Sequence, residues 1–268
     1  MLPLELVALD ATPLELIPYW TTGTGHDAPS EHQLPVYTGT VHGLPQAITS
    51  VVVASDLQGV VRVPGGEVLL GEALVDYLEL LYALHFPGLT RDQALALLCG
   101  DLYANPAKRG ESGNPFRVWE AFSAAFGCTI GIAGNHDDFG PDLARVQALP
   151  KAHFLTQGTA NADGLRVAGL SGIIGRPDKN FRLAEDTYVQ GVAALLRQAP
   201  HVLLTHLSPR LDAAGLQGDA CLTAALAMGP PTLVLCGHSH WPTVEPQVLA
   251  NGTQVLNADS KVFILTRT

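Results

Sequence analysis

The sequence is short of cysteine and of charge. Its four cysteines (Cys99, Cys128, Cys221 and Cys236) form no C-x-x-C pair and predict no disulfide framework. We therefore expect free thiols and a reducing, cytoplasmic localisation. Charged residues make up only 15% of the 268 positions and hydrophobic residues 47%. This balance favours a large buried core and argues against intrinsic disorder.

The sequence also lacks a long apolar run and an excess of basic residues. No stretch of about 18 apolar residues occurs, which argues against a membrane span. Residues 1–10 contain no Lys or Arg, so they do not resemble a secretory signal. The net charge of -10, from 15 basic and 25 acidic residues, disfavours binding to long nucleic acid. A small phosphate ester remains a suitable partner, and the oligomeric state is left open.

Short apolar segments alternate with amphipathic ones along most of the chain. The alternation predicts an α/β layered fold. Strands are expected at 51–54, 95–99, 128–133, 165–170, 201–205, 232–236, 243–249, 253–257 and 261–266, the last three with added antiparallel pairing. Helices are expected at 67–85, 116–126, 141–149, 187–198 and 222–228. We expect a single domain, 1–268, in which residues 1–46 form a loop-rich N-terminal extension.

Asp, Asn and His residues recur where these apolar strands end. The segments are Ser-Asp-Leu-Gln-Gly at 55–59, Gly-Asp-Leu-Tyr at 100–103, Gly-Asn-His-Asp-Asp at 134–138, Leu-Thr-His-Leu at 204–207 and Gly-His-Ser-His at 237–240. In open α/β sheets, ligands gather beyond the carboxyl ends of the strands. Five strand ends that deliver such side chains to one edge predict a divalent metal site.

The order of these segments resembles the pattern D-x-H, G-D, G-N-H-[DE], H and G-H-x-H of the calcineurin-like metallophosphoesterases. It is close to the order in class III cyclic-nucleotide phosphodiesterases. The resemblance implies a β-sandwich of two mixed sheets flanked by helices. It also implies two divalent metal ions with a metal-bridging hydroxide that attacks phosphorus.

The resemblance gives each residue of the pattern a role. Asp56 and His240 would bind the first metal, and Asp101 would bridge both metals. The remaining ligands, all for the second metal, would be Asn135, His206 and His238. His136 would protonate the leaving oxygen or stabilise the charged phosphorus centre, and Asp137 would orient His136 by accepting its other ring proton.

The first segment departs from the pattern because it has Gln58 where the family has histidine. A neutral amide oxygen suits Mn or Mg better than Zn, so we expect Mn, with Fe, Zn, Mg or Ni as alternatives. Three basic residues in loops near the pattern, Lys108, Arg109 and Arg176, are candidate contacts for a substrate phosphate; ordinary surface charge is the alternative for each.

We expect a metal-dependent phosphoesterase acting on small phosphodiesters or phosphomonoesters, with diesters favoured. One alternative is a nucleotide or protein phosphomonoesterase. An alternative of another class is a non-catalytic metal-binding scaffold on the same fold. Gln58, in place of the family's histidine, would be one step in that direction.

Overall fold

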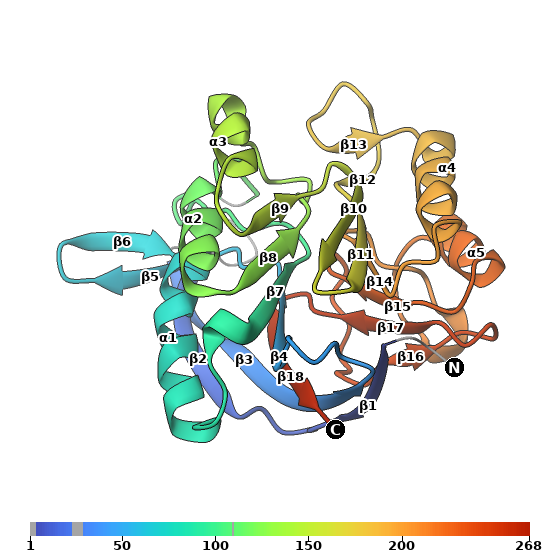
Figure 1. Cartoon of the computed structure of the whole chain (residues 1–268). Coiled ribbons are helices and arrows are strands. Elements are labelled where there is room, and N and C mark those ends of the chain that lie inside the picture. The colour runs from blue at the N-terminus through green and yellow to red at the C-terminus, as the bar shows by residue number, and fades with distance from the viewer. Residues whose placement is uncertain (1–3, 23–28, 109) are drawn as a thin grey trace.

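In a computed structural model, described for residues 4–22, 29–108 and 110–268, two mixed β-sheets face each other and helices cover both outer sides. Figure 1 shows α1, α2 and α3 beside one sheet and α4 and α5 beside the other. The structure confirms the expected α/β sandwich of two mixed sheets flanked by helices.

The first sheet has ten strands in the order β6-β5-β2-β3-β18-β4-β7-β8-β9, with β1 paired to β3. The strands are β1 (Glu5–Leu9), β2 (Glu15–Thr22), β3 (Pro29–His42), β4 (Ser50–Ser55), β5 (Val60–Val63), β6 (Gly66–Leu69), β7 (Ala94–Leu98), β8 (Cys128–Gly131), β9 (Ala152–Phe154) and β18 (Lys261–Arg267). Strands β4, β7, β8 and β9 are parallel, so their carboxyl ends lie along one edge.

The second sheet has six strands in the order β10-β11-β14-β15-β17-β16. They are β10 (Gln157–Ala162), β11 (Leu165–Leu170), β14 (Val202–Thr205), β15 (Leu233–Cys236), β16 (Gln247–Val248) and β17 (Gln254–Asn257). Strands β11, β14, β15 and β17 are parallel. A small separate sheet pairs β12 (Ile173–Ile174) with β13 (Arg182–Leu183).

Five α-helices are described: α1 (Leu70–His85), α2 (Phe116–Ala125), α3 (Leu143–Gln147), α4 (Glu185–Leu196) and α5 (Ala220–Met228). Short 3-10 turns lie at Arg91–Gln93, Gly140–Asp142 and Asp212–Ala214. Each helix lies close to its expected position, with the ends shifted by a few residues. Among the helices that the structure describes, none is long and apolar enough to cross a membrane.

Strand β4 shows why the central strands consist almost entirely of apolar residues. Val51 and Val53 point into the core between the two sheets, whereas Val52 and Ala54 point into the core under α1 and α2. All four side chains are buried. A strand covered on both faces needs apolar side chains at every position rather than at alternate ones. Burial of one such side chain is worth about 1.5–3 kcal/mol.

The expectation that residues 1–46 form a loop-rich extension is wrong. Strands β2 and β3 form a long antiparallel hairpin, and β3 runs parallel to β18 at the centre of the first sheet. The segment is rich in Gly, Pro and Thr, which locally suggests loop. Its strand structure depends on pairing with β18, whose residues lie more than 200 positions later in the chain.

One further expectation needs correction. Residues 67–69, expected at the start of the first helix, lie in β6, which forms a hairpin with β5 that Figure 1 shows projecting beyond α1. The antiparallel pairing expected of the last strands is confirmed: β16 pairs antiparallel with β17 in the second sheet, and β18 pairs antiparallel with β4 in the first sheet. The final strand thereby joins the two halves of the chain.

Candidate metal centre

The polar residues predicted at the strand ends follow parallel strands of both sheets. Asp56, Asp101 and His238 have φ angles of 53°, 52° and 67°, in the left-handed region that non-glycine residues rarely adopt. Such conformations cost about 1–3 kcal/mol each and cluster at functional sites. These three turns therefore hold a strained backbone conformation, which costs folding free energy and directs the side chains of Asp56, Asp101 and His238.

Three side chains from different strand ends come together as a group that could hold a metal ion. One ligand atom each from Asp101, His206 and His238 lies within 4.8 Å of the others. The rings of His206 and His238 are 5.1 Å apart, centroid to centroid. Asp101 and His206 are buried, so their polar atoms face one another rather than water.

The hydrogen bonds of His206 leave its Nε2 directed into this group. Its Nδ1 donates to the backbone carbonyl of Cys99 at 2.8 Å, which fixes the ring and leaves Nε2 as the atom available to a metal. Nε2 lies 3.2 Å from Asp101 Oδ2, but in a geometry that makes no hydrogen bond. His206 Nε2 and Asp101 Oδ2 are both buried and lie close together without a hydrogen bond between them. A cation bound by both atoms would account for this arrangement.

Asn135 adds a fourth donor atom, which is buried and unpartnered like His206 Nε2. Its Oδ1 is buried and has no hydrogen-bond partner among the described residues. A buried amide oxygen left without a partner costs about 1–3 kcal/mol. A carboxylate, two imidazoles and an amide oxygen form a mixed set that suits Mn, Fe or Zn rather than a purely oxygen-liganded ion.

Burial and the crowding of carboxylates raise the pKa values of two of the acids around this group. Burial raises the pKa of Asp56 to about 8, with His206 opposing the shift and Asp259 adding to it. Burial and then the charge of Asp101 raise the pKa of Asp137 to about 7. The pKa of Asp101 is lowered, because His206 outweighs the effect of its burial. A divalent cation at this point would favour the ionised form of all three acids.

Glycine precedes the ligands because side chains and backbone approach too closely there for a Cβ. A Cβ at Gly134 would lie 2.0 Å from Asp101 Oδ1, and one at Gly237 would lie 2.2 Å from Asp56 Oδ2. A Cβ at Gly100 would lie 2.3 Å from the backbone nitrogen of Gly134. The Gly-Asp, Gly-Asn-His and Gly-His segments thus owe their glycines to packing between neighbouring turns.

The residues expected around the first metal are less closely gathered. Asp56 Oδ2 accepts from the Ser55 hydroxyl at 2.6 Å and from the His238 backbone N–H at 3.0 Å. Gln58 Nε2 donates to Asp101 Oδ2 at 3.3 Å. His240 Nδ1 instead lies 3.0 Å from Asp259 Oδ2, and its side chain is 75% exposed. The structure brings Gln58 to the Asp101 carboxylate. That Asp101 bridges two ions and that His240 binds metal stay predictions.

The role expected for Asp137 needs correction. Its carboxylate accepts three backbone N–H bonds, from Asp101 and Gly134 to Oδ2 and from Leu102 to Oδ1, at 2.8–2.9 Å. His136 Nδ1 is buried without a partner and is not bonded to Asp137. Asp137 therefore holds two ligand turns together, and His136 is positioned through its backbone N–H, which donates to Asp101 Oδ1 at 2.8 Å.

The basic residues expected to contact phosphate are not gathered at this centre. Lys108 is 70% exposed and pairs with Glu111, and Arg176 is 73% exposed and pairs with Asp178. Arg109 lies outside the described residues. Arg210, which the sequence analysis did not single out, lines a hollow of about 370 Å³ together with His238, but it too is exposed and pairs with an acid, Asp212.

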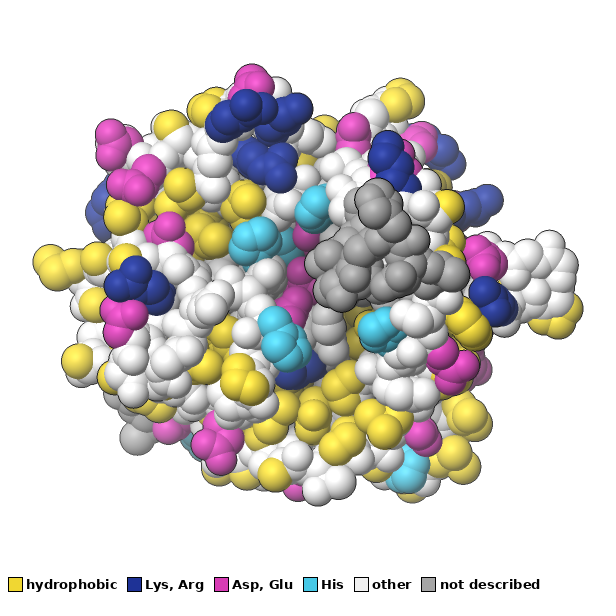
Figure 2. Space-filling view, turned by 180° about the vertical axis from the view of Figure 1, so that it is seen from behind, with side chains coloured by type: hydrophobic (Ala, Val, Ile, Leu, Met, Phe, Trp, Pro, Cys, Tyr) yellow, Lys and Arg dark blue, Asp and Glu magenta, His cyan; other side chains and the backbone are white. Residues whose placement is uncertain are grey.

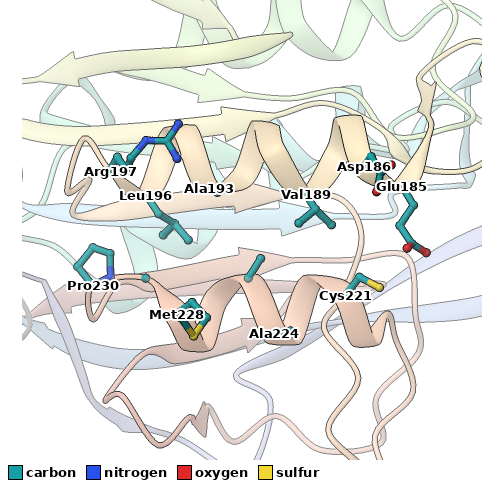
Figure 3. A pocket seen from close by; sticks show the side chains of 12 residues that line it. Glu185, Asp186, Val189, Ala193, Leu196, Arg197, Cys221, Ala224, Met228 and Pro230 are labelled. Atoms are coloured by element: carbon teal, nitrogen blue, oxygen red, sulfur yellow. The ribbon is translucent and has the colours of Figure 1, made fainter.

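Figure 2 shows His and acidic side chains gathered around a hollow in the middle of one face of the molecule. Asp56 and Gln58 line a hollow of about 230 Å³ beside the ligand group. A larger groove of about 580 Å³ lies elsewhere, between α4 and α5 (Figure 3). Its wall is mainly apolar, with Val189, Leu196 and Met228 among its residues, and none of the predicted ligands lines it.

Comparison with known proteins agrees with this geometry. Residues 49–242 match the family model described as calcineurin-like phosphoesterase, and the chain belongs to that family of metal-dependent phosphoesterases. No curated protein matches the sequence. Among solved structures, the chain resembles the protein TT1561 of Thermus thermophilus, with 19% identity, a TM-score of 0.56, and coverage of 80% of this chain and 90% of that one.

A hypothetical protein from Thermus thermophilus is also similar, with 15% identity, a TM-score of 0.47, and coverage of 82% of this chain and 77% of that one. At such identities the likeness to TT1561 shows a shared fold and leaves the substrate open. The resemblance inferred from the five strand-end segments is thus confirmed at the level of family and fold.

Proposed function

We propose that this protein hydrolyses small phosphate esters, with phosphodiesters favoured, using divalent metal held by Asp101, His206, His238 and Asn135. The observation that carries the proposal is a set of converging donors, buried except for His238, in which Asn135 Oδ1 and His206 Nε2 have no hydrogen-bond partner among the described residues. In a family of metal-dependent phosphoesterases, a cation is the group that such a set would bind.

The metal would supply a lowered pKa for an attacking water and neutralisation of the phosphate charge. The chain's own residues would do the rest. Asp101 would fix the position of His136 by accepting its backbone N–H. His136 would give a proton to the leaving oxygen from its other ring nitrogen, Nε2, because its Nδ1 is buried. Asp137 would keep the turns of Asp101 and Gly134 at a constant separation.

We further propose two metal ions, with Mn the preferred element. Gln58 and Asp56 line the same hollow beside the ligand group, and their oxygens suit Mn or Mg. The amide of Gln58 already reaches the carboxylate of Asp101, which is the residue expected to bridge two ions. The first position would bind more weakly because it lacks the usual histidine.

A second candidate function, a non-catalytic metal-binding module, is favoured by one observation. The exposed side chain of His240 turns to Asp259 rather than into the ligand group. If that arrangement persists with metal bound, the first position would lack both of its histidines. The protein would then bind one ion tightly without assembling a reactive pair.

Turnover decides between the two. We would measure hydrolysis of bis-p-nitrophenyl phosphate and p-nitrophenyl phosphate by metal-stripped protein with added Mn. We expect Mn-dependent release of p-nitrophenolate, faster from the diester, with loss of activity in His206→Asn. His153→Asn, which alters an exposed histidine in β9, is the matched control and should remain active. Mn binding without turnover of either ester would favour the module.

A further inference from the structure

The β2–β3 hairpin lies outside the matched family region, yet it packs against the metal centre. Tyr19 of β2 covers Gly59, where a Cβ would lie 2.2 Å from the tyrosine ring. Gly59 follows Gln58 directly, so the hairpin rests on the first ligand turn. Trp20, the next residue of β2, pairs with Val60 of β5. Residues before the family region 49–242 thus form part of the wall of the site.

The hairpin, the first ligand turn and the loop after Asp101 together enclose the hollow of about 230 Å³. Tyr19 and His32 come from the hairpin, Gln58 from the ligand turn and Tyr103 from the loop. Tyr19 and His32 are directly opposite each other in the β2–β3 register and therefore share one face of the hairpin. Their ring centroids are 5.8 Å apart.

Three rings, those of Tyr19, His32 and Tyr103, lie among the otherwise mostly polar side chains that line this hollow. His32 is held by a 2.9 Å contact between its Nε2 and the Ser30 hydroxyl. The Tyr103 ring packs over Gly113, where a Cβ would lie 2.3 Å from it, so its position is fixed as well. Fixed aromatic walls favour offset or edge-to-face contact with another ring. A cavity of about 150 Å³ accommodates benzene, so the hollow has room for about one substituted ring.

We propose that this hollow receives a ring carried by the ester group of the substrate, and that His32 of the hairpin and Tyr103 of the loop set this preference. The inference rests on the proposed function, because the phosphate of the same molecule would lie at the metal centre. The hairpin thereby contributes to the choice of ester through His32, while the proposed metal ligands all lie in the family region.

The test compares two non-hydrolysable ligands, phenylphosphonate and methylphosphonate, by calorimetric titration into the Mn-loaded full chain. Both present the same phosphonate to metal, and only one carries a ring. We expect phenylphosphonate to bind about tenfold more tightly, as its additional non-hydrogen atoms would suggest. His32→Ala should reduce this ratio about threefold or more, and so should Tyr103→Leu.

Gln33→Ala is the matched control. Gln33 is exposed on the same strand as His32, but neighbouring residues of a strand point to opposite faces. The ratio in this variant should equal that of the wild type. Binding of methylphosphonate should be the same in all variants, which also shows that they are folded and hold metal.

Equal affinities for the two phosphonates in the wild type would overturn the inference, and so would a ring preference that His32→Ala and Tyr103→Leu leave unchanged. Hydrolysis of p-nitrophenyl esters by a protein that binds the two phosphonates equally would overturn the role of the hollow and leave the proposed function standing. A ring preference that depends on His32, in a protein that hydrolyses no ester, would support the hollow and contradict the proposed function.

Discussion

Gly134→Ala tests whether the close packing of the ligand turns sustains metal binding. The added Cβ would lie 2.0 Å from Asp101 Oδ1 and 2.5 Å from the Asp101 backbone nitrogen. Non-bonded contacts below about 3 Å are not tolerated, so the two turns must separate by about 0.5–1 Å. Asp101 cannot rotate away freely, because Oδ1 accepts the His136 N–H and its own N–H donates to Asp137.

A displacement of this size is large for a metal site, where ligand distances hold to about 0.2 Å. We expect Mn affinity to fall about 10- to 100-fold, as for loss of a group that orients a ligand. Overpacking also costs about 1–3 kcal/mol of stability. That loss should lower the Tm by a few degrees in a chain of this length.

Calorimetric Mn titration of metal-stripped protein and a thermal scan measure both effects. Gly158→Ala is the matched control, because a Cβ at this position in β10 meets nothing within 4 Å. It should bind Mn like the wild type and keep its Tm or gain slightly. If Gly134→Ala bound Mn as tightly as Gly158→Ala with the same Tm, the reasoning from close packing would be refuted.

Four more variants or conditions separate the roles of neighbouring residues. Asp137→Ala leaves three backbone N–H groups without their acceptor and should cost about 3 kcal/mol or more of unfolding free energy. Asp138→Ala removes one exposed acceptor, for the Gly140 N–H, and should cost about 1 kcal/mol or less by denaturant titration; equal costs would contradict the bracing role. His136→Ala should keep bound Mn and lose about a hundredfold in rate, with a greater loss for alkyl esters than for p-nitrophenyl esters; a loss of bound Mn would contradict this. Gln58→His should lower the Mn concentration needed for half-maximal rate, and an unchanged requirement would show that residue 58 is not a ligand. Burial lowers the pKa of His206, but the carboxylates of Asp101 and Asp56 outweigh it and raise the pKa to about 10. Mn must therefore displace a proton from His206, and its affinity should rise about tenfold per pH unit between about pH 6 and 8; a flat profile would oppose this.

The metal ligands could be predicted from sequence because their signal is local. Each follows a short strand whose residues are apolar on both faces, so a polar residue after residues 51–54 or 95–99 stands out. The glycine before Asp101, and those before Asn135 and His238, mark turns that need close backbone approach. Parallel strands then bring these ends together without further information.

The surroundings of the ligands could not be predicted, because they depend on contacts between distant residues. Asp137 is bonded to N–H groups about 35 positions earlier in the chain, and nothing next to it in sequence indicates them. Asp259, the partner of His240, follows the last segment of the family pattern by 19 positions. Tyr19 and His32 reach the site because β3 pairs with β18 and β2 pairs with β5.

Anomalous diffraction from crystals grown with Mn tests the central claim most directly. The account predicts a strong peak bounded by Asp101 Oδ2, His206 Nε2, His238 and Asn135 Oδ1, and a weaker one on the side of Asp56 and Gln58. Both peaks should weaken in His206→Asn crystals, more so the first. Mn peaks only at other positions, with Asn135 Oδ1 and His206 Nε2 still without a ligand, would contradict the assignment of this group as the metal centre.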